Sequence, residues 1–512
     1  MWVKSIDLVS VRGFIGTTVE FGPKLNVIVG ANNSGKTTIL KSLLSLQIDA
    51  FTAQDIRLGN SASTIRIETA GTYEGDGFAP YRNSTYEQNI PNGSRILQGP
   101  SGKRGINAFP SNEPNNYIYP FLSKRKVTGY QEGVNLSYTR QVSGNFANLY
   151  PKIDRISNPE FLPAYEDYIQ ACDDILGFRV SAVPSNNGKK GAYIIQNDIS
   201  IPIDLMGEGI ANLLALIVDL CVANDRLFLI EEPENDIHPK ALKALLKLIE
   251  KKSATNQFII TSHSNIVTKF IGSSDKGKVI STYMSFIDRI PTSNISYAET
   301  QEQRQAVLED LGYEMNDFNL WDFWLFLEES SAEEIIREIL IPNFTPALEP
   351  KLKTYSCAGA NKVEAKFDDF NRLFVFLYLQ KVYINKAWVL IDGGDEEGRI
   401  IKKMNEMYNK SGWSSDNFIQ FKEHDFEKYY PDEFTDAVNE ILKIEDKGAR
   451  RDRKSELLKE VLRWSREDIE RAAKGFEKSA REVISILKDI ENKMLNKGNE
   501  KDDQIAAVPV TD

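Results

Sequence analysis

Short apolar runs bounded by polar turns recur along the first 300 residues. Buried strands are predicted at residues 26–29, 227–232 and 258–262, where β-branched and aromatic residues are concentrated. Amphipathic or apolar helices are predicted at residues 38–46, 210–222 and 240–251, the last opened by Pro239. Strands that alternate with helices in this way predict an α/β fold with a parallel sheet.

The alternation of strands and helices begins again after a domain boundary expected near residues 291–297 and a bridging helix at 302–311. Residues 324–327 and 387–391 are buried-type strands, and helices are predicted at 332–340 and 363–379. Between the first two strands of the chain's first part, residues 48–200 are rich in Gly, Pro, Asn and Ser. Short alternating segments such as 64–73 are predicted to be strands there, and residues 159–176 are predicted to be one amphipathic helix.

Near the C-terminus, apolar residues alternate in steps of four and three, which is a heptad seam flanked by charge. The seam consists of Ile469, Ala473, Phe476, Ala480, Val483, Leu487, Ile490 and Met494. It predicts a helix that packs either on its own domain or on a second copy or partner. Residues 497–512 are predicted to be a disordered tail.

Composition narrows the class of protein. A chain of 512 residues is long enough for two to four domains, and its three cysteines are too widely spaced for a disulfide framework. No apolar run is long enough to span a bilayer, and no signal-like N-terminus is present, so we expect a cytoplasmic protein. The net charge of −11 disfavours general nucleic-acid binding, except through a local basic surface or a bound metal.

The strand that begins at Asn26 leads into a complete phosphate-binding loop, G-x-x-x-x-G-K-[ST]. Gly30 and Gly35 allow the backbone to wrap around phosphate oxygens, Lys36 contacts the β- and γ-phosphates, and Thr37 is a ligand of Mg²⁺. The predicted ATP-binding residues are Gly30, Ala31, Asn32, Asn33, Ser34, Gly35, Lys36, Thr37 and Thr38.

Two carboxylates end the second strand, and a histidine ends the third. Glu231 is predicted to hold the Mg²⁺ shell, while Glu232 orients or activates the attacking water. His263 is predicted to sense or stabilise the γ-phosphate. Upstream, the Gly-rich turn at 205–209 opens a helix, so Gly207, Glu208 and Gly209 are further candidates for anion binding.

The order of these elements resembles the ATP-binding-cassette (ABC) class of ATPase heads. In that class two heads enclose two ATP molecules, and the Gly-rich turn of one head completes the site of the other. A homodimer or higher oligomer through the heads is therefore expected. Met206 and Glu208 depart from the usual L-S-G-G-Q turn, which argues against strong ATP-driven dimer switching but not against ATP binding.

Within that class, E-E-P-E-N-D-I-H-P at residues 231–239 and the opening segment resemble the OLD (overcoming lysogenisation defect) family. SMC-type heads are an alternative, but they carry a long heptad-patterned arm that is missing at 48–200. Ring-forming AAA+ motors are expected to show an arginine-bearing lid, and no clear one follows the carboxylates.

Carboxylates also end the two strands of the second part, and strand ends of a parallel sheet converge at one edge, where they can hold Mg²⁺. The pattern resembles a Toprim domain, which OLD proteins carry directly after the ATPase. On that resemblance the metal ligands are Glu329, Glu333, Asp392 and Asp395, with Glu396 as a substitute for Asp395, and Mn²⁺ as a substitute for Mg²⁺. Residues 357–367 and 424–431 also match related segments.

Two departures from the Toprim motif leave the activity of this site open. Ser330 stands where the motif favours glycine, and D-G-G-D at residues 392–395 is one residue longer than D-x-D. The resemblance also implies a lysine that steadies the transition state, for which Lys454 is the candidate. Lys454 belongs to a basic stretch that is either a contact for the DNA backbone or a solvated helix start: Lys447, Arg450, Arg451, Arg453 and Lys454.

The predicted organisation is an α/β protein with an ABC-type P-loop ATPase head at residues 1–300, which includes an insertion around 75–165. A Toprim-like domain at 301–430, a helical region at 431–496 and the tail follow. The resemblance implies an ATP-binding, Mg²⁺-dependent DNA endonuclease in anti-phage defence, alone or with a neighbour-encoded partner. Two alternatives are an ATPase sensor with a degenerate Toprim domain that regulates a separate effector, and a repair ATPase that loads on DNA ends without cutting.

Overall fold

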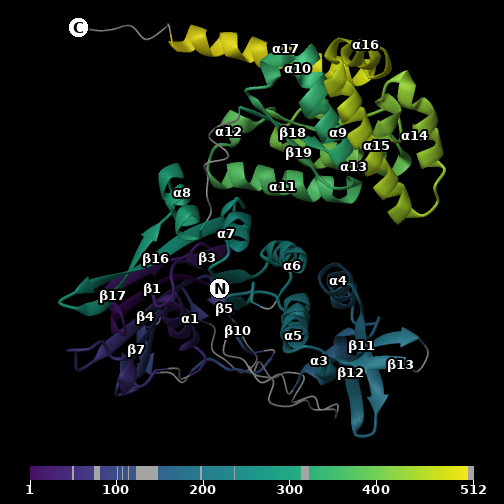
Figure 1. The fold of residues 1–512 in the computed structure, drawn as a ribbon. Helices are drawn as coiled ribbons and strands as arrows, with labels where there is room; N and C mark the ends of the chain where they lie inside the picture. The colour runs from purple at the N-terminus through teal and green to yellow at the C-terminus, as the bar shows by residue number, and fades with distance from the viewer. Residues whose placement is uncertain are drawn as a thin grey trace, which may run out of the picture. The chain divides into compact units, whose positions relative to one another are not determined.

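The chain forms two compact units, Met1–Tyr313 and Glu314–Asp512, which are described separately below (Figure 1). The computed structural model describes residues 1–48, 51–73, 81–100, 102–105, 108–113, 115–122, 148–196, 199–235, 237–312 and 322–505. Residues 75–80 and 123–147 of the predicted insertion at 75–165, a few single positions within it, and residues 506–512 of the predicted tail lie outside these ranges. None of the described helices is both long enough and apolar enough to cross a membrane.

A six-stranded parallel-rich sheet carries the predicted nucleotide elements of the first unit. Its order is β10-β14-β15-β3-β16-β17, and all neighbours are parallel except the hairpin β16–β17. The strands are β10 (Ile118–Phe121), β14 (Leu227–Glu231), β15 (Gln257–Ser262), β3 (Leu25–Val29), β16 (Gly277–Ile287) and β17 (Ile290–Tyr297). Strands β3, β14 and β15 are buried along their whole length, which explains their continuous apolar sequences.

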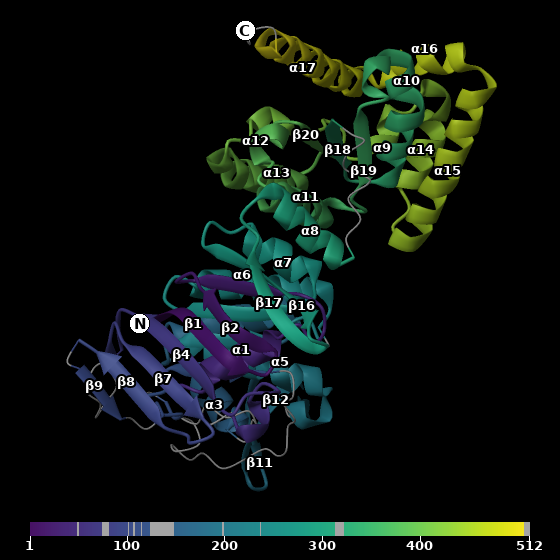
Figure 2. The same cartoon turned by 90° about the vertical axis from the view of Figure 1, so that its left-hand side faces the viewer.

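A second sheet of six antiparallel strands completes the core of this unit (Figure 2). Its order is β2-β1-β4-β7-β8-β9, with bounds Phe14–Glu20, Trp2–Val11, Ser63–Ala70, Thr85–Ile90, Arg95–Gly99 and Gly102–Gly105. Helix α1 (Lys36–Leu44) buries Ile39, Leu40 and Leu43 in the same cluster as residues of both sheets. The helix that follows the phosphate loop is therefore fixed within the main core.

The remaining elements of the first unit lie around the parallel sheet. Helices α5 (Glu208–Val222), α6 (Pro239–Lys252) and α7 (Asn265–Gly272) pack in sequence against one another, as Figure 1 shows. Helix α3 (Leu149–Ile156) packs on a three-stranded sheet of β11 (Val180–Ser185), β12 (Gly188–Gln196) and β13 (Ile199–Pro202). The short pair β5 (Thr72–Tyr73) and β6 (Tyr81–Arg82) and helix α8 (Gln301–Asp310) complete the unit.

Two predicted boundaries differ from the observed ones. The helix expected at 159–176 begins only at Ala164, as α4 (Ala164–Ala171), and ends in a π-helical turn, Cys172–Leu176, because residues 157–163 form turns. The segment at 291–297, expected to be a domain boundary, is most of the edge strand β17, and the chain divides at Tyr313 instead.

The second unit is built on a four-stranded, fully parallel sheet of order β19-β18-β20-β21. The strands are β19 (Leu352–Ser356), β18 (Phe323–Leu327), β20 (Ala387–Ile391) and β21 (Phe418–Gln420). Helices α11 (Ala360–Phe376) and α13 (Asp395–Tyr408) bury residues in the cluster formed with Trp324 and Val389 on one face. The small helix α12 (Gln380–Tyr383) lies between α11 and β20 in the chain.

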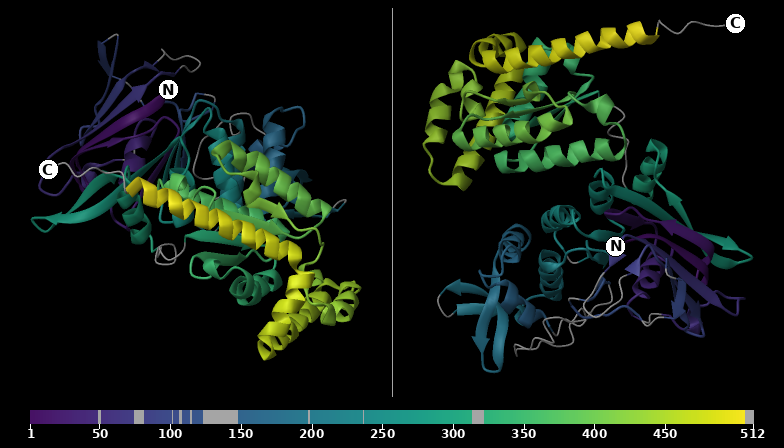
Figure 3. Two further views of the ribbon diagram at one scale, coloured as in Figure 1. Left: turned by 90° about the horizontal axis from the view of Figure 1, so that it is seen from above. Right: turned by 180° about the vertical axis from the view of Figure 1, so that it is seen from behind.

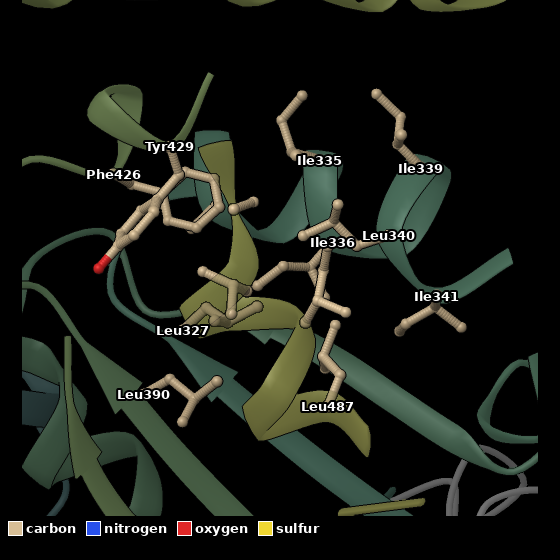
Figure 4. Packing of buried hydrophobic residues seen from close by; sticks show 14 of the residues in the cluster. Leu327, Ile335, Ile336, Ile339, Leu340, Ile341, Leu390, Phe426, Tyr429 and Leu487 are labelled. Carbon is tan, nitrogen blue, oxygen red and sulfur yellow. The ribbon is translucent and has the colours of Figure 1, made fainter. Parts of the chain in front are cut away.

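The opposite face of this sheet is covered by helices from before β19 and from the C-terminal region. Leu327 and Leu390 of the sheet share a cluster with Ile335, Ile336 and the C-terminal helices (Figure 4). The helices are α9 (Ser330–Ile335), the π-helical turn Ile336–Leu340, α10 (Ile341–Phe344), α14 (Thr435–Leu442), α15 (Lys447–Glu467), α16 (Ile469–Ser479) and α17 (Arg481–Ile505). The helical region predicted at 431–496 thus shares its core with the sheet.

The heptad seam runs through two helices because Ala480, which is not helical, separates α16 from α17. Phe476, Leu487 and Met494 are buried against the sheet of their own unit, whereas Ile469 at the start of the seam is 62% exposed. The packing of the seam on its own domain, one of the two predicted alternatives, is what the structure shows. Helix α17, the long yellow helix in both panels of Figure 3, continues to Ile505, so part of the predicted tail is helical.

Candidate functional site

The phosphate-binding loop joins β3 to α1 in the conformation that its glycines predict. Gly30 (φ 150°), Asn33 (φ 65°) and Gly35 (φ 110°) all have positive φ, which favours glycine and tolerates asparagine. A Cβ on Gly30 would lie 2.0 Å from the backbone oxygen of Thr282 in β16. Ala31, Asn32 and Asn33 are exposed, so their backbone is accessible to phosphate, whereas Thr38 is buried in the helix.

Lys36 lies over this loop. Its Nζ donates to the backbone oxygens of Gly30, at 2.8 Å, and Ala31, at 3.0 Å, and the residue is 6% exposed. Burial lowers the pKa of Lys36, and the nearby carboxylates of Glu232 and Glu231 oppose that shift. The charge is thus held at the position where a phosphate-binding lysine contacts the nucleotide.

Thr37 and Glu231 lie side by side, as a shared Mg²⁺ shell requires. The Thr37 hydroxyl donates to Oε1 of Glu231, which ends the buried strand β14. A hydroxyl and a carboxylate are hard oxygen donors, and Mg²⁺ is typically held by one or two such groups together with nucleotide phosphates. These two residues therefore fit a nucleotide-bound Mg²⁺.

Glu232 has a backbone and a side chain that are both constrained. Its φ of 49° is uncommon for a residue other than glycine, and such values cluster at functional sites. Asn235 Nδ2 donates to Oε2 of Glu232 at 2.8 Å, and His263 Nε2 lies 3.2 Å from Oε1. The predicted water-orienting carboxylate and the predicted phosphate-sensing histidine are therefore in contact.

The Gly-rich turn borders the same cavity as Glu231 and Glu232 of its own head, a proximity that the sequence does not predict. Helix α5 begins at Glu208 with Gly207 as its N-cap, and the side chain of Glu208 is outside the described part of the chain. Gly209 lines a cavity of about 140 Å³ together with Glu231, Glu232 and other residues of β14 and the turn after it. A second small cavity joins Gly30, Ala31 and His263 to Asp310 at the end of α8.

In the second unit, neighbouring parallel strands bring the predicted acidic residues to one sheet edge. Strand β18 ends before Glu328 and Glu329, and β20, paired with it in parallel, ends before Asp392. Oε2 of Glu328 accepts from the Asp392 backbone N–H at 3.2 Å. Burial, followed by the charges of Glu328 and Glu329, raises the pKa of Asp392 to about 8.

Lys454 of α15 lies among three carboxylates from two segments of the chain. Its Nζ is 2.8 Å from Glu427, 2.9 Å from Asp425 and 3.5 Å from Glu329. Burial opposes its charged form, but Glu427 and Glu329 raise the pKa of Lys454 well above its ordinary value. The prediction that Lys454 belongs to this site thus agrees with its position, and the same contacts hold the residue in an acidic surrounding.

The oxygen donors at this edge fit a hard divalent cation in chemistry, since carboxylates are the ligands that Mg²⁺ and Mn²⁺ prefer. Glu427 is 1% exposed, and Lys454, whose Nζ lies 2.8 Å from Oε2, is its charge partner. Among the residues that the structure describes, no three His, Cys, Asp or Glu side chains are grouped closely enough to hold a metal ion.

Two of the four predicted metal ligands are not brought into this group. Glu333 pairs with Arg337 at 2.8 Å and accepts from the hydroxyl of Thr354 in β19. Asp395 is exposed at the first position of α13, and Glu397 from the same turn folds back over Gly394 instead. The extra glycine of D-G-G-D is required by packing, because a Cβ on Gly393 would lie 2.8 Å from the backbone oxygens of residues 422 and 423.

The basic stretch is divided between this site and solvent. Arg450 and Lys454 both pair with Asp425. Arg451 and Arg453 have side chains that are 85% and 60% exposed, on the same first turns of α15. Two basic residues of the stretch are therefore structural partners of the acidic edge, and others remain available next to it.

Sequence matches agree with the nucleotide elements. A family model described as "AAA domain" matches residues 5–150, and one described as "AAA domain, putative AbiEii toxin, Type IV TA system" matches residues 173–268. Together with the loop, the paired carboxylates and the histidine, these matches define the first unit as a P-loop ATPase head of the AAA/ABC type. The match to such ATPases supports ATPase activity, and the α/β fold class predicted from the sequence is confirmed.

Curated relatives are similar over short segments. The DNA replication and repair protein RecF of Clostridioides difficile (strain 630) is 31% identical over 81 residues, which cover 16% of this chain and 21% of that protein. RecF of Bacillus pumilus (strain SAFR-032) is 24% identical over 119 residues, covering 23% and 29% of the two chains. The chain therefore spans less than a third of the length of either relative.

Solved structures of SMC head domains are similar at a low level. The SMC head bound to the C-winged helix domain of ScpA has a TM-score of 0.43 and 17% identity, covering 58% of this chain and 99% of that chain. The Pyrococcus furiosus head with an extended coiled coil, bound to the C-terminal domain of ScpA, has a TM-score of 0.42 and 15% identity, covering 61% and 100%. At these scores the likeness adds nothing to the assignment made from motifs and sequence matches.

Some residues of both sites were missed by the sequence analysis. Glu234 and Asn235 lie within the quoted motif, yet nothing in the sequence tells which of its polar residues contact Glu232 and His263. Asp425 and Glu427 follow β21, whose three residues are too few to show a strand pattern. The signal available for them was the segment at 424–431, to which no role was assigned.

Proposed function

We propose that this protein is an ATP-binding, divalent-metal-dependent DNA endonuclease of the OLD type, in which the ATPase head is followed by a Toprim-like nuclease unit. The observation that supports the proposal most is the group of carboxylates from the ends of neighbouring parallel strands, joined by Lys454. That group combines Glu329 and Asp392, predicted from the sequence, with Asp425 and Glu427.

In this proposal each unit has a separate chemical task. In the head, Lys36 binds the β- and γ-phosphates, Thr37 and Glu231 hold Mg²⁺, and Glu232 orients the water for hydrolysis. In the second unit, Glu328 or Glu329, Asp392 and Glu427 are the residues that would hold a divalent cation once their side chains move closer together than in this structure, and the cation would act as a Lewis acid on the phosphodiester. Lys454 supplies positive charge next to the phosphate, and Arg451 and Arg453 contact the DNA backbone.

DNA as the substrate is supported by two further points. The relatives with matching segments are named as DNA replication and repair proteins. The exposed arginines of α15 provide a local basic surface in a chain whose net charge is −11. A role in anti-phage defence, alone or beside a neighbour-encoded partner, follows from the OLD resemblance, and dimerisation through the heads follows from the resemblance to ABC-type ATPase heads.

Plasmid cleavage by the purified protein tests the proposal, with EDTA, Mg²⁺ or Mn²⁺ and with or without ATP. We expect nicking with Mg²⁺ or Mn²⁺ and none with EDTA. Asp392→Ala should lower nicking at least about 100-fold because it removes a central ligand, while ATP binding stays unchanged. Asp416→Ala is the matched control, since the Asp416 side chain is 69% exposed and pairs with Lys493 at 3.0 Å. Full cleavage by Asp392→Ala would refute the site.

A second candidate function is an ATPase sensor whose Toprim-like unit does not cut and which regulates a separate effector. It is favoured by Lys454, which occupies the centre of the carboxylates, and by the positions of Glu333 and Asp395 outside the group. Purified protein that binds ATP but cleaves no DNA with either metal would favour this function. ATP hydrolysis that DNA stimulates, again without cleavage, would instead favour a repair ATPase that loads on DNA ends.

A further inference from the structure

One carboxylate next to the ATPase site, that of Glu234, accepts several hydrogen bonds from the loop after β15, and no motif assigns it a role. Oε1 of Glu234 accepts from Ser262 Oγ at 2.7 Å, from the His263 backbone N–H at 2.7 Å and from the Ser264 backbone N–H at 3.1 Å. We propose that Glu234 is a positioning residue for ATP hydrolysis, which holds the His263 loop so that the imidazole contacts Glu232.

The topology explains why these residues meet. Strands β14 and β15 are parallel neighbours, with Glu231 opposite Thr261, so the turns that follow them emerge side by side. The Glu232 backbone N–H donates to the Thr261 backbone oxygen at 2.9 Å, which continues the pairing by one residue. Glu234, on the turn after β14, thereby reaches the loop after β15.

The loop that Glu234 holds is also the start of a helix. Ser264 is the N-cap of α7, where its hydroxyl accepts from the Ile266 N–H. The N–H groups of residues 263 and 264 precede that helix and have no acceptor within it. A carboxylate at a helix N-terminus is stabilised by such N–H groups and by the helix dipole. Glu234 therefore fixes the direction in which His263 leaves the backbone.

Loss of Glu234 would affect the position of Glu232. Its two carboxylate oxygens are contacted separately, Oε2 by Asn235 and Oε1 by His263. Because the histidine contact depends on the loop that Glu234 holds, loss of Glu234 should release one side of the water-orienting carboxylate. The other oxygen of Glu234, Oε2, is buried and has no hydrogen-bond partner within the described part of the chain, and the carboxylate adds negative charge near Lys36.

This inference rests on ATP hydrolysis by the head and is independent of the nuclease unit. Steady-state hydrolysis by the full-length protein is measured for Glu234→Ala, Glu234→Gln, His263→Ala and the double variant Glu234→Ala/His263→Ala. Binding of a fluorescent ATP analogue and the melting temperature are measured in parallel. Glu20→Ala is the matched control, because the Glu20 side chain is 68% exposed and has no proposed role in ATP hydrolysis.

We expect Glu234→Ala to lower kcat roughly tenfold or more while the dissociation constant of the nucleotide changes less than about twofold. Glu234→Gln should keep most of kcat, since its amide oxygen can accept the same three hydrogen bonds. The double variant should be no slower than His263→Ala, because a residue that acts only through His263 adds no further loss.

Independent, multiplying losses from Glu234→Ala and His263→Ala would overturn the proposal, as would an unchanged kcat for Glu234→Ala. A Glu234→Gln variant as slow as Glu234→Ala would assign the effect to charge near Lys36 and contradict the positioning role. If His263→Ala is slow and Glu234→Ala is not, the inference fails while the ATPase assignment stands. A wild-type protein without hydrolysis would contradict both.

Discussion

Single residues in the nucleotide loop are determined by backbone geometry more than by side-chain chemistry. Gly30 is the clearest example, because its φ of 150° and the closeness of β16 both exclude a Cβ. The contact is with the backbone of Thr282, which cannot rotate away as a side chain does. The first glycine of the motif thus serves the packing of loop on strand as well as the approach of phosphate.

Gly30→Ala should therefore damage both the loop and its function. We expect the loss of measurable ATP binding and a lower melting temperature, since either the loop or β16 must move. Isothermal titration with ATP and Mg²⁺ and thermal unfolding measure the two effects. Gly16→Ala is the control: apart from its chain neighbours, no described residue has a heavy atom within 4 Å of a Cβ built there, and Gly16 lies in the extended strand β2. Equal ATP affinity of wild type and Gly30→Ala would contradict this account.

At the scale of elements, buried ion pairs join the helices around the parallel sheet. Lys152 of α3 is 7% exposed, and its Nζ is 2.6 Å from Asp219 of α5 and 3.0 Å from Glu113. Burial disfavours the ammonium ion, yet Asp219 and Glu113 raise the pKa of Lys152. The helix that follows the Gly-rich turn is thereby tied to the three-stranded sheet through α3.

Lys152→Met should destabilise the first unit by about 3–5 kcal/mol, because it leaves two buried carboxylates without their cation. Urea unfolding followed by fluorescence measures the change. Lys189→Met is the matched control, since Lys189 pairs with Asp154 at the surface, and such pairs contribute at most about 1 kcal/mol. Similar losses for the two variants would contradict a special role of the buried group.

The C-terminal helices are part of the core of the second unit, as the burial of Leu487 of α17 shows (Figure 4). Leu487→Ala should cost about 2–5 kcal/mol of unfolding free energy, as large-to-small changes in cores do. Leu495→Ala, at a position that is 52% exposed in the same helix, should cost less than about 0.5 kcal/mol. Urea unfolding tests both. Light scattering should give an unchanged mass for Leu487→Ala, and a change to a smaller oligomer would revive the self-association hypothesis.

At the scale of the whole molecule, the chain consists of two compact units with separate cores. The carboxylate group of the second unit and the phosphate loop of the first belong to different units. Helix α8, which ends the first unit, lines a cavity with Gly30, Ala31 and His263 through Val307, Asp310 and Leu311. The last described helix before the second unit therefore borders the same cavity as the nucleotide loop.

Two units with separate cores should respond to ligands separately. In differential scanning calorimetry, ATP with Mg²⁺ at about 100 times its dissociation constant should stabilise the first unit by about 2.7 kcal/mol. Lys36→Ala identifies that transition, because it removes the nucleotide-dependent shift. Mn²⁺ without nucleotide should shift only the other transition. A single transition that both ligands raise equally would show that the units unfold as one.

The sequence alone was sufficient to predict the phosphate loop and the strands that carry it. A fully buried parallel strand has a continuous apolar run, and a phosphate loop has fixed spacing, so both are visible without tertiary contacts. It was also sufficient to place Glu329 and Asp392 at strand ends on one sheet edge, because parallel strands fix that edge.

Only the tertiary structure decided which side chains join those residues. Asp425 and Glu427 lie in the turn after β21 and Lys454 lies in α15, and their association with Glu329 and Asp392 depends on how α15 packs on the sheet. Glu333 contacts Arg337 and Thr354 instead, and Asp395 is exposed at the start of α13. Local pattern determines strands, helices and loops, whereas the partners of a polar side chain depend on what the fold brings within about 3 Å of it.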